Sequence, residues 1–171
     1  MIVLLFYGNP YIRLNSNAVD ITANKINFFT FFKLPAAFWC GVRATNINDE
    51  RCTVTVRHGW RNQNPFNSIY FAVQAMAAEL STGALAVYHI KNSNRKVSML
   101  VTRNNGLYTK KATGKITFTC LDGKLMQEAV EKAISTGEGQ TVIMKSIGTN
   151  SLGEHVSELL FEWSVKLKNN R

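Results

Sequence analysis

The sequence has few of the residues that bind metals or form disulfide frameworks. Its three cysteines are odd in number and share no metal or redox spacing, and its three histidines lie far apart. These six residues are Cys40, Cys52, Cys120, His58, His89 and His155. Because the cysteines have apolar neighbours, we expect them to be small core residues in a reducing compartment. The sequence therefore predicts a cytoplasmic protein without a metal site.

Long hydrophobic runs, charge blocks and internal repeats are also missing. The apolar run of residues 1–7 is too short to span a bilayer. It also lacks the basic region and cleavage site of a signal peptide. No block of five like charges occurs, and there is no nucleic-acid-binding motif or basic helix. We therefore expect neither a nucleic acid nor a membrane as the partner.

The composition is that of one folded domain with an excess of positive charge. Of 171 residues, 46% are hydrophobic, which is ample for a core. Residues 1–24 show no clear period and are predicted to be an N-terminal extension, followed by a single domain over residues 25–168. The net charge of +9 indicates an anionic partner. On charge alone, the partner could be a nucleic acid, an anionic membrane or a polyphosphorylated molecule such as coenzyme A.

Aromatic residues recur at helical spacing over residues 25–38, and Pro35 should end that helix. If these rings were exposed, they would form a large hydrophobic surface patch. We therefore expect the helix to cover a sheet edge, an acyl tunnel or a subunit contact. A membrane-surface helix is the competing interpretation, and it is disfavoured because only Lys25 and Lys33 are basic there.

Alternating apolar residues predict a mostly antiparallel sheet. Residues 41–47 and 51–57 form the expected hairpin across residues 48–50. The remaining expected elements are strands at residues 97–102, 107–110, 116–120, 141–147 and 159–168, with a turn or bulge at 104–106 and a short helix over 125–134 that ends near Gly137. Trp60 and Trp163 are expected in the core. The fold class is α+β, and the sheet's free face and edge favour a homo-oligomer.

The central feature is a helix predicted from Asn67 to Ser81, apolar on every side. Asn67 and Ser68 are the expected N-cap, and Gly83 ends or bends the helix before an apolar continuation. Glu79 is the one formally charged residue between Arg61 and Lys91. A carboxylate there is costly to bury unless it is used or paired. The alternative is a core helix whose glutamate reaches solvent or a subunit interface.

The sequence around this helix resembles the hotdog-fold thioesterases. In the phenylacetate-pathway acyl-CoA thioesterases the region reads Asn-x-x-Gly-x-x-His-Gly-Gly-x-x-x-x-Leu-Ala-Asp. Laid over it without a gap, Asn64 falls on the Asn, Tyr70, Phe71 and Ala72 fall on His-Gly-Gly, and Glu79 falls on the catalytic acid. A closer likeness is to an uncharacterised hotdog branch with Trp-Arg-Asn-x-Asn ahead of the helix, Tyr-Phe within it and Ala-Ala-Glu near its end.

The resemblance implies a mostly antiparallel sheet wrapped around one long helix, and an acyl-CoA thioesterase-like activity. Glu79 would act as nucleophile or general base, and the N–H of Ala72 would polarise the thioester carbonyl. Asn64 would help to hold water or the carbonyl, and Asn62, Tyr70 and Phe71 would join Ala72 in binding the substrate. The site would lie between subunits of a homodimer or tetramer, with coenzyme A present only as part of the substrate.

The sequence departs from the family pattern where glycine is expected. Asn67, Phe71 and Ala72 replace glycines that let a thioester approach the backbone closely. For this reason a non-catalytic acyl- or fatty-acid-binding protein remains the alternative to a thioesterase. Tyr70 occupies the site nearest to the catalytic histidine of hotdog dehydratases, so a dehydratase is disfavoured.

Overall fold

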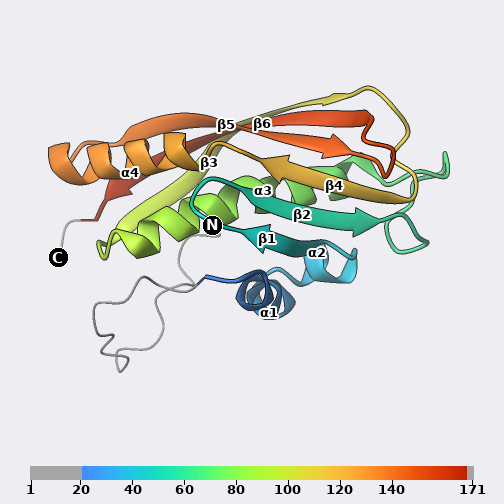
Figure 1. Ribbon diagram of the computed structural model, residues 1–171, viewed down its shortest axis with the longest axis horizontal. Coiled ribbons are helices and arrows are strands. Elements are labelled where there is room, and N and C mark those ends of the chain that lie inside the picture. The colour runs from blue at the N-terminus through green and yellow to red at the C-terminus, as the bar shows by residue number, and fades with distance from the viewer. Residues whose placement is uncertain (1–20, 169–171) are drawn as a thin grey trace.

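One long helix, α3 (Phe71–Asn92), lies against a six-stranded sheet in the computed structural model, which describes residues 21–168 (Figure 1). Residues 1–20, which make up most of the predicted extension, lie outside the described part. Within it, every pair of neighbouring strands is antiparallel, in the order β1-β2-β4-β5-β6-β3. The strands are β1 (Arg43–Ile47), β2 (Cys52–Arg57), β3 (Val97–Tyr108), β4 (Lys115–Cys120), β5 (Gln140–Thr149) and β6 (His155–Leu167). The predicted α+β hotdog architecture is confirmed.

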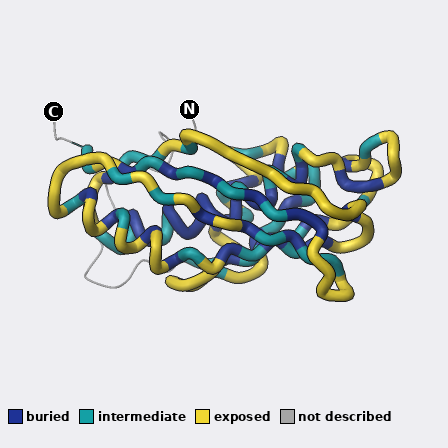
Figure 2. Tube along the Cα trace, turned by 90° about the horizontal axis from the view of Figure 1, so that it is seen from above, coloured by how far each residue is buried: buried dark blue, intermediate teal, exposed yellow. Residues whose placement is uncertain are grey.

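The core lies between α3 and the sheet. The helix contacts all six strands, and its alanines at positions 77, 78 and 86 have no exposed surface. Small side chains let the strands approach the helix closely. The buried residues of β2 and β6 alternate with mostly half-buried ones, as the sequence predicts. Figure 2 shows buried segments along the middle of the molecule and exposed loops at its ends. Trp163 belongs to this core, whereas Trp60, also predicted there, is 82% exposed.

The central helix begins and ends later than predicted. Asn67 has a positive φ of 56°, which a helix cannot continue, so the expected cap at Asn67 and Ser68 is wrong. These residues belong to a turn, and the first helical residue is Phe71. The helix does not end or bend at Gly83 but continues to Asn92. Gly83 instead lies against the ring of Trp163.

Strand β3 runs unbroken where two strands and a turn were predicted. It pairs with β6 from Val97 to Tyr108, and its bulge lies between Val101 and Arg103 and not at residues 104–106. Asn104, Asn105 and Gly106 have turn-like residue types, but the long partner β6 supplies a continuous ladder for them. Local turn propensity is overridden by strand pairing.

The aromatic N-terminal segment forms two helices, α1 (Ala23–Lys33) and α2 (Pro35–Trp39). Pro35 ends the first, as predicted, and also begins the second, because proline suits the first helical position. Helix α1 covers the outer edge of the sheet through Asn27. That side chain donates to the carbonyl of Ala44 in β1 and accepts its N–H, both at 2.8 Å.

Helix α4 (Gly123–Thr136) packs on α3, β5 and β6 near the end of the sheet. It ends at Gly137, as predicted, in the left-handed conformation that favours glycine at this position. Among residues 21–168, no helix is long and apolar enough to cross a membrane.

Candidate functional site

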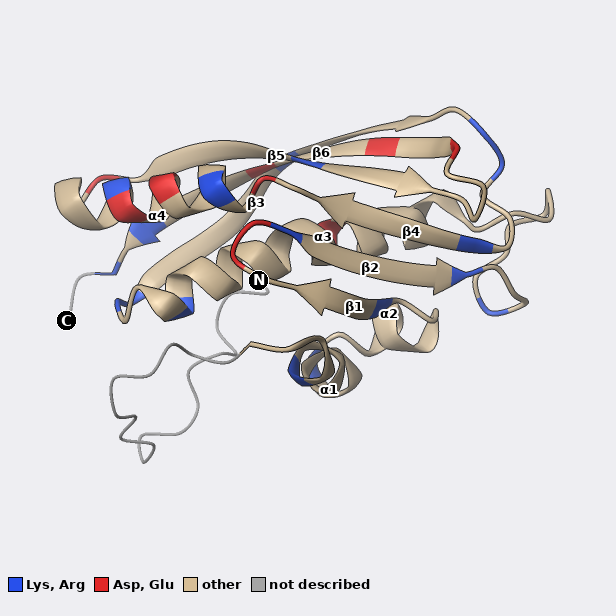
Figure 3. Cartoon of the chain, viewed as in Figure 1, with Lys and Arg blue, Asp and Glu red and all other residues tan. Residues whose placement is uncertain are grey.

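Glu79 lies on α3, half-buried, beside Gly83 and the ring of Trp163. A side chain on Gly83 would come within 3.3 Å of the Glu79 carboxylate and 3.2 Å of that ring. Glycine therefore leaves the room in which the carboxylate and the indole lie side by side. Apart from Glu79, the helix has no Asp, Glu, Lys or Arg before Lys91 (Figure 3).

The Glu79 carboxylate has no hydrogen-bond or ion-pair partner among the described residues. Burial raises the pKa of this carboxyl to about 7. The cost of burying this carboxylate, expected from the sequence, is therefore seen as a raised pKa, and no cation among the described residues opposes it. A carboxyl with a pKa near neutrality is suited to accept and return a proton at physiological pH.

Trp163 is held in place against Glu79 by Thr82. The indole N–H donates to the Thr82 hydroxyl at 3.1 Å, and that hydroxyl donates to the Glu79 carbonyl at 3.0 Å. Sequence reasoning placed Trp163 in the core but missed its position beside the carboxylate. The two residues are 84 positions apart, and only the register of β6 against α3 brings them together.

The start of α3 presents unused hydrogen-bond donors. The carbonyl of Tyr70 accepts hydrogen bonds from the N–H groups of Val73 and Gln74. The N–H groups of Phe71 and Ala72 have no acceptor among the described residues. These donors lie at the positive end of a 22-residue helix. They are suited to an anion or to the developing negative charge on a carbonyl oxygen.

A single chain does not bring these donors and the carboxylate together. Ala72 and Glu79 are separated by two helical turns, a rise of about 10 Å. The carboxylate also points toward Gly83, which is further along the helix and away from Ala72. One thioester group cannot contact both within one protomer.

Asn62 and Asn64 organise the loop before α3. The Asn62 side chain is buried; it donates to the carbonyls of Cys40 and Arg57 at 2.9 and 2.8 Å and accepts the Gly59 N–H at 3.0 Å. Asn64 accepts the N–H groups of Phe66 and Ser68 and donates to the Ser68 hydroxyl at 3.0 Å. In this arrangement both amides are occupied within the loop.

Tyr70 and Phe71 form an exposed aromatic cluster with Tyr108 of β3. The ring centroids of Tyr70 and Phe71 are 4.8 Å apart, and those of Phe71 and Tyr108 are 6.0 Å apart. The neighbouring residue, Leu107, is 62% exposed, and the outer edge of β3 pairs with no strand among the described residues. Apolar side chains and an unpaired strand edge occur together at the start of α3.

Uncharged polar residues also line α3, and the sequence analysis missed them. Ser81 shares a hydrogen bond with Ser146 of β5 at 2.8 Å, and His89 bonds the Asp49 carbonyl at 2.9 Å. Gln74 is buried; its amide donates to the Ile69 carbonyl at 3.2 Å, while its own carbonyl oxygen has no partner among the described residues. Gln74, Ser81 and His89 recur about every two turns of an otherwise apolar helix, and this spacing was the available signal.

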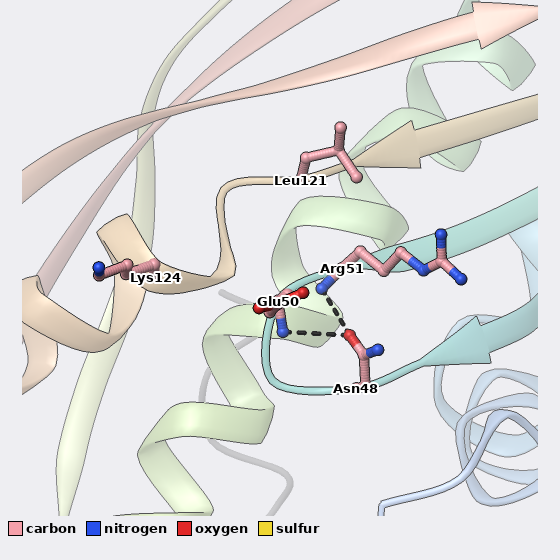
Figure 4. A pocket seen from close by; sticks show the side chains of 5 residues that line it. All are labelled: Asn48, Glu50, Arg51, Leu121 and Lys124. Carbon is pink, nitrogen blue, oxygen red and sulfur yellow. Dashed lines mark hydrogen bonds between the residues drawn. The ribbon is translucent and has the colours of Figure 1, made fainter.

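An open hollow of about 470 Å³ lies between the β1–β2 turn and the start of α4 (Figure 4). It is lined by Asn48, Glu50, Arg51, Leu121 and Lys124. The Asn48 side chain accepts the N–H groups of Glu50 and Arg51, and the Arg51 and Lys124 side chains point apart. None of the predicted site residues lines it. The adjoining Asp49 contacts His89, about 15 Å along α3 from Glu79.

No group of three or more His, Cys, Asp or Glu side chains in residues 21–168 is placed to hold a metal ion. The three cysteines are free thiols. Cys52 and Cys120 face each other on β2 and β4, and burial raises the pKa of each to about 12. Both are therefore inert core thiols at neutral pH.

Residues 24–165 match a family described as "Domain of unknown function (DUF4442)". Among solved structures, a Pseudomonas aeruginosa protein named a "Probable Thioesterase" is similar, with a TM-score of 0.77 and 20% identity, covering 89% of this chain and all of that one. A Haemophilus influenzae thioesterase has a TM-score of 0.66 and 12% identity, with 88% and 94% of the two chains covered. At these identities the likeness establishes the hotdog fold alone. No curated protein matches the sequence.

Proposed function

The chain belongs to the DUF4442 family of hotdog-like domains, and from this premise we propose that it hydrolyses an acyl thioester, with coenzyme A as the carrier. The observation that carries the proposal is Glu79: a half-buried carboxyl without a partner among the described residues, whose pKa is raised to about 7 by burial. The names of two structural neighbours, which call them thioesterases, support the same activity.

In the proposed reaction Glu79 is the general base. The carboxylate takes a proton from water, and the resulting hydroxide attacks the thioester carbonyl carbon. The negative charge that develops on the carbonyl oxygen is stabilised by the N–H groups at the start of α3. When the tetrahedral intermediate collapses, the C–S bond breaks, the thiolate leaves and takes up a proton, and a carboxylic acid is released.

The proposed site is shared between two copies of the chain. Two helical turns separate Ala72 from Glu79, so the donors must come from one subunit and the carboxylate from the other. The exposed edge of β3 and the aromatic cluster of Tyr70, Phe71 and Tyr108 supply an apolar surface for a homodimer. In a two-fold dimer the arrangement occurs twice.

The charge of the chain supports coenzyme A as the carrier. Its net charge of +9 concentrates anionic ligands, and the phosphates of coenzyme A are such a ligand. The inert free thiols fit a reducing cytoplasm, where we place the protein.

Hydrolysis of a panel of acyl-CoA thioesters, followed by thiol release, tests the activity. We expect turnover by the wild type and a loss of at least about a hundredfold in Glu79→Gln, since removing a general base costs on that order. Glu131→Gln, an exposed acid on α4, is the matched control and should retain activity. No hydrolysis by the wild type, or equal rates in Glu79→Gln, would remove the catalytic proposal.

A second candidate is a non-catalytic acyl-binding protein. The observation that favours it is Phe71, 54% exposed at the start of α3, where a glycine would let a thioester approach the backbone. Native mass spectrometry of the purified protein distinguishes the two. A copurifying fatty acid or acyl-CoA, together with absent turnover, supports binding alone, while rapid release of free acid argues for the enzyme.

A further inference from the structure

The exposed side of α1 and α2 carries a continuous group of aromatic rings, here called the aromatic face: Phe28, Phe31, Phe32, Phe38 and Trp39. Neighbouring ring centroids lie 4.7–6.1 Å apart. Phe28 is 70% exposed, Phe32 59% and Trp39 58%. Exposed rings that contact one another in this way mark a site of interaction.

The rings are not needed to hold α1 on the sheet. Ile26 and Thr30 are the buried residues of the helix, and Asn27 bonds the edge of β1. Phe28, Phe31 and Phe32 follow at positions that turn to the opposite side of the helix. Helix α1 thus covers a sheet edge, one of the three contacts expected of this segment, but it does so through Asn27 and not through its rings. The aromatic face is left to a partner.

Every charged residue of α1, α2, β1 and the loop before α3 is basic. No Asp or Glu occurs between residues 21 and 48 or between residues 51 and 78 (Figure 3). Lys25 and Lys33 lie on α1, and Arg43 lies over the Phe38 ring, 3.5 Å from its centroid. Arg61 belongs to the loop that Asn62 ties to the end of α2. More basic residues surround the rings than the two lysines that the helical segment itself supplies.

We propose that the aromatic face docks on the surface of an anionic phospholipid bilayer. Phe and Trp rings enter the boundary between headgroups and acyl chains, while lysine and arginine contact the anionic headgroups. This revises the expectation that a membrane is no partner, which counted only the basic residues of the helical segment. The association is peripheral and reversible, and it is independent of whether Glu79 is catalytic.

A second copy of the chain is a poorer occupant. Two aromatic faces brought together would place the basic residues of each copy opposite those of the other. Like charges across an interface oppose association, and α1, α2, β1 and the loop before α3 contain no acid to offset them. An anionic surface matches both the rings and the charges.

Vesicle flotation with the full chain tests the proposal, using phosphatidylcholine alone and phosphatidylcholine with about one third phosphatidylglycerol. We expect binding to the anionic vesicles only, weakened by salt. Phe28→Ser/Phe32→Ser should reduce the bound fraction at least about tenfold, because two large apolar side chains are removed from the contact. Leu152→Ser, at an 81% exposed site in the β5–β6 turn, is the control and should bind as the wild type does.

Tryptophan fluorescence reports whether the aromatic face itself makes the contact. In a Trp60→Phe background, Trp39 is the exposed tryptophan and Trp163 is already buried. A blue shift on adding anionic vesicles, lost in Trp39→Phe, supports docking through α2. Absence of binding, equal binding of the double serine variant, or equal binding to neutral vesicles overturns the proposal. Conversion of a dimer to a monomer by the double serine variant would assign the face to self-association instead.

Discussion

At the scale of single residues, the molecule is organised around a carboxyl group that is difficult to ionise. Burial alone raises the pKa of Glu79. Trp163 and Gly83 lie beside its carboxylate oxygens. Sequence reasoning identified Glu79, because a lone acid in an apolar helix is visible in the chain. It did not identify Trp163 as its neighbour, because that contact depends on how a distant strand packs across α3.

Burial of Glu79 predicts a stability that depends on pH. The folded pKa of about 7 exceeds the ordinary value of 4.5, so folding is penalised as pH rises from 4.5 through 7. Glu79→Gln removes this penalty. In urea unfolding, the variant's advantage in unfolding free energy over the wild type should grow by roughly 1–3 kcal/mol from acid pH to about pH 8. Glu131→Gln should show no such gain, and a pH-independent difference in Glu79→Gln would contradict the burial of this acid.

Asn62 is predicted to act as a scaffold residue for the start of α3. It makes three hydrogen bonds while 6% exposed, so Asn62→Ala leaves buried backbone groups unpaired. We expect a loss of about 2–4 kcal/mol of unfolding free energy, since each unpaired buried group costs about 1–3 kcal/mol. The exposed neighbour Gln63→Ala should change it by less than about 0.5 kcal/mol. Equal effects of the two substitutions in thermal or urea unfolding would argue against this role.

At the scale of elements, most of the sheet could be predicted from the sequence, because alternation is a local signal. Strands β2, β4 and β6 follow it directly. The start of α3 could not be predicted, since Asn67 and Ser68 suit a helix cap as well as the turn that they form. The continuous β3 was missed because Asn104, Asn105 and Gly106 read as a turn until β6 is present to pair with them.

The junction between α1 and the sheet yields a prediction about edge protection. Asn27 satisfies both backbone groups of Ala44 at the outer edge of β1. Asn27→Ala should lower the unfolding free energy by about 1–3 kcal/mol and increase hydrogen exchange at Ala44. Asn24→Ala, an exposed asparagine one turn earlier in α1, is the control. Unchanged exchange at Ala44 in Asn27→Ala would show that α1 does not hold this edge.

At the scale of the whole molecule, the account requires two copies of the chain for one site. Glu79→Gln leaves the donors at the start of α3, while Ala72→Pro removes a donor in the first turn, where proline is tolerated. Each homodimer should be inactive. Unfolding and refolding an equal mixture should restore about one quarter of wild-type activity, since half of the dimers are mixed and each has one intact site.

Circular dichroism and melting temperature establish that both variants used in this mixing experiment are folded. If the site lay within one chain, mixing would restore nothing. The same result would follow if the chain acted as a monomer, which sedimentation of the wild type would reveal. Recovery of activity on mixing is therefore specific to a site shared between subunits.

The central claim is that Glu79 works as a base whose ionisation sets the rate. It is tested most directly by the pH dependence of kcat/KM for the preferred acyl-CoA, measured for the wild type and Glu79→Gln. The predicted wild-type profile rises with a slope of one on the acid side and levels off above a midpoint near 7, the raised pKa of Glu79, while the variant stays near background throughout. A wild-type profile without this rise, or a variant that retains it, would contradict the account.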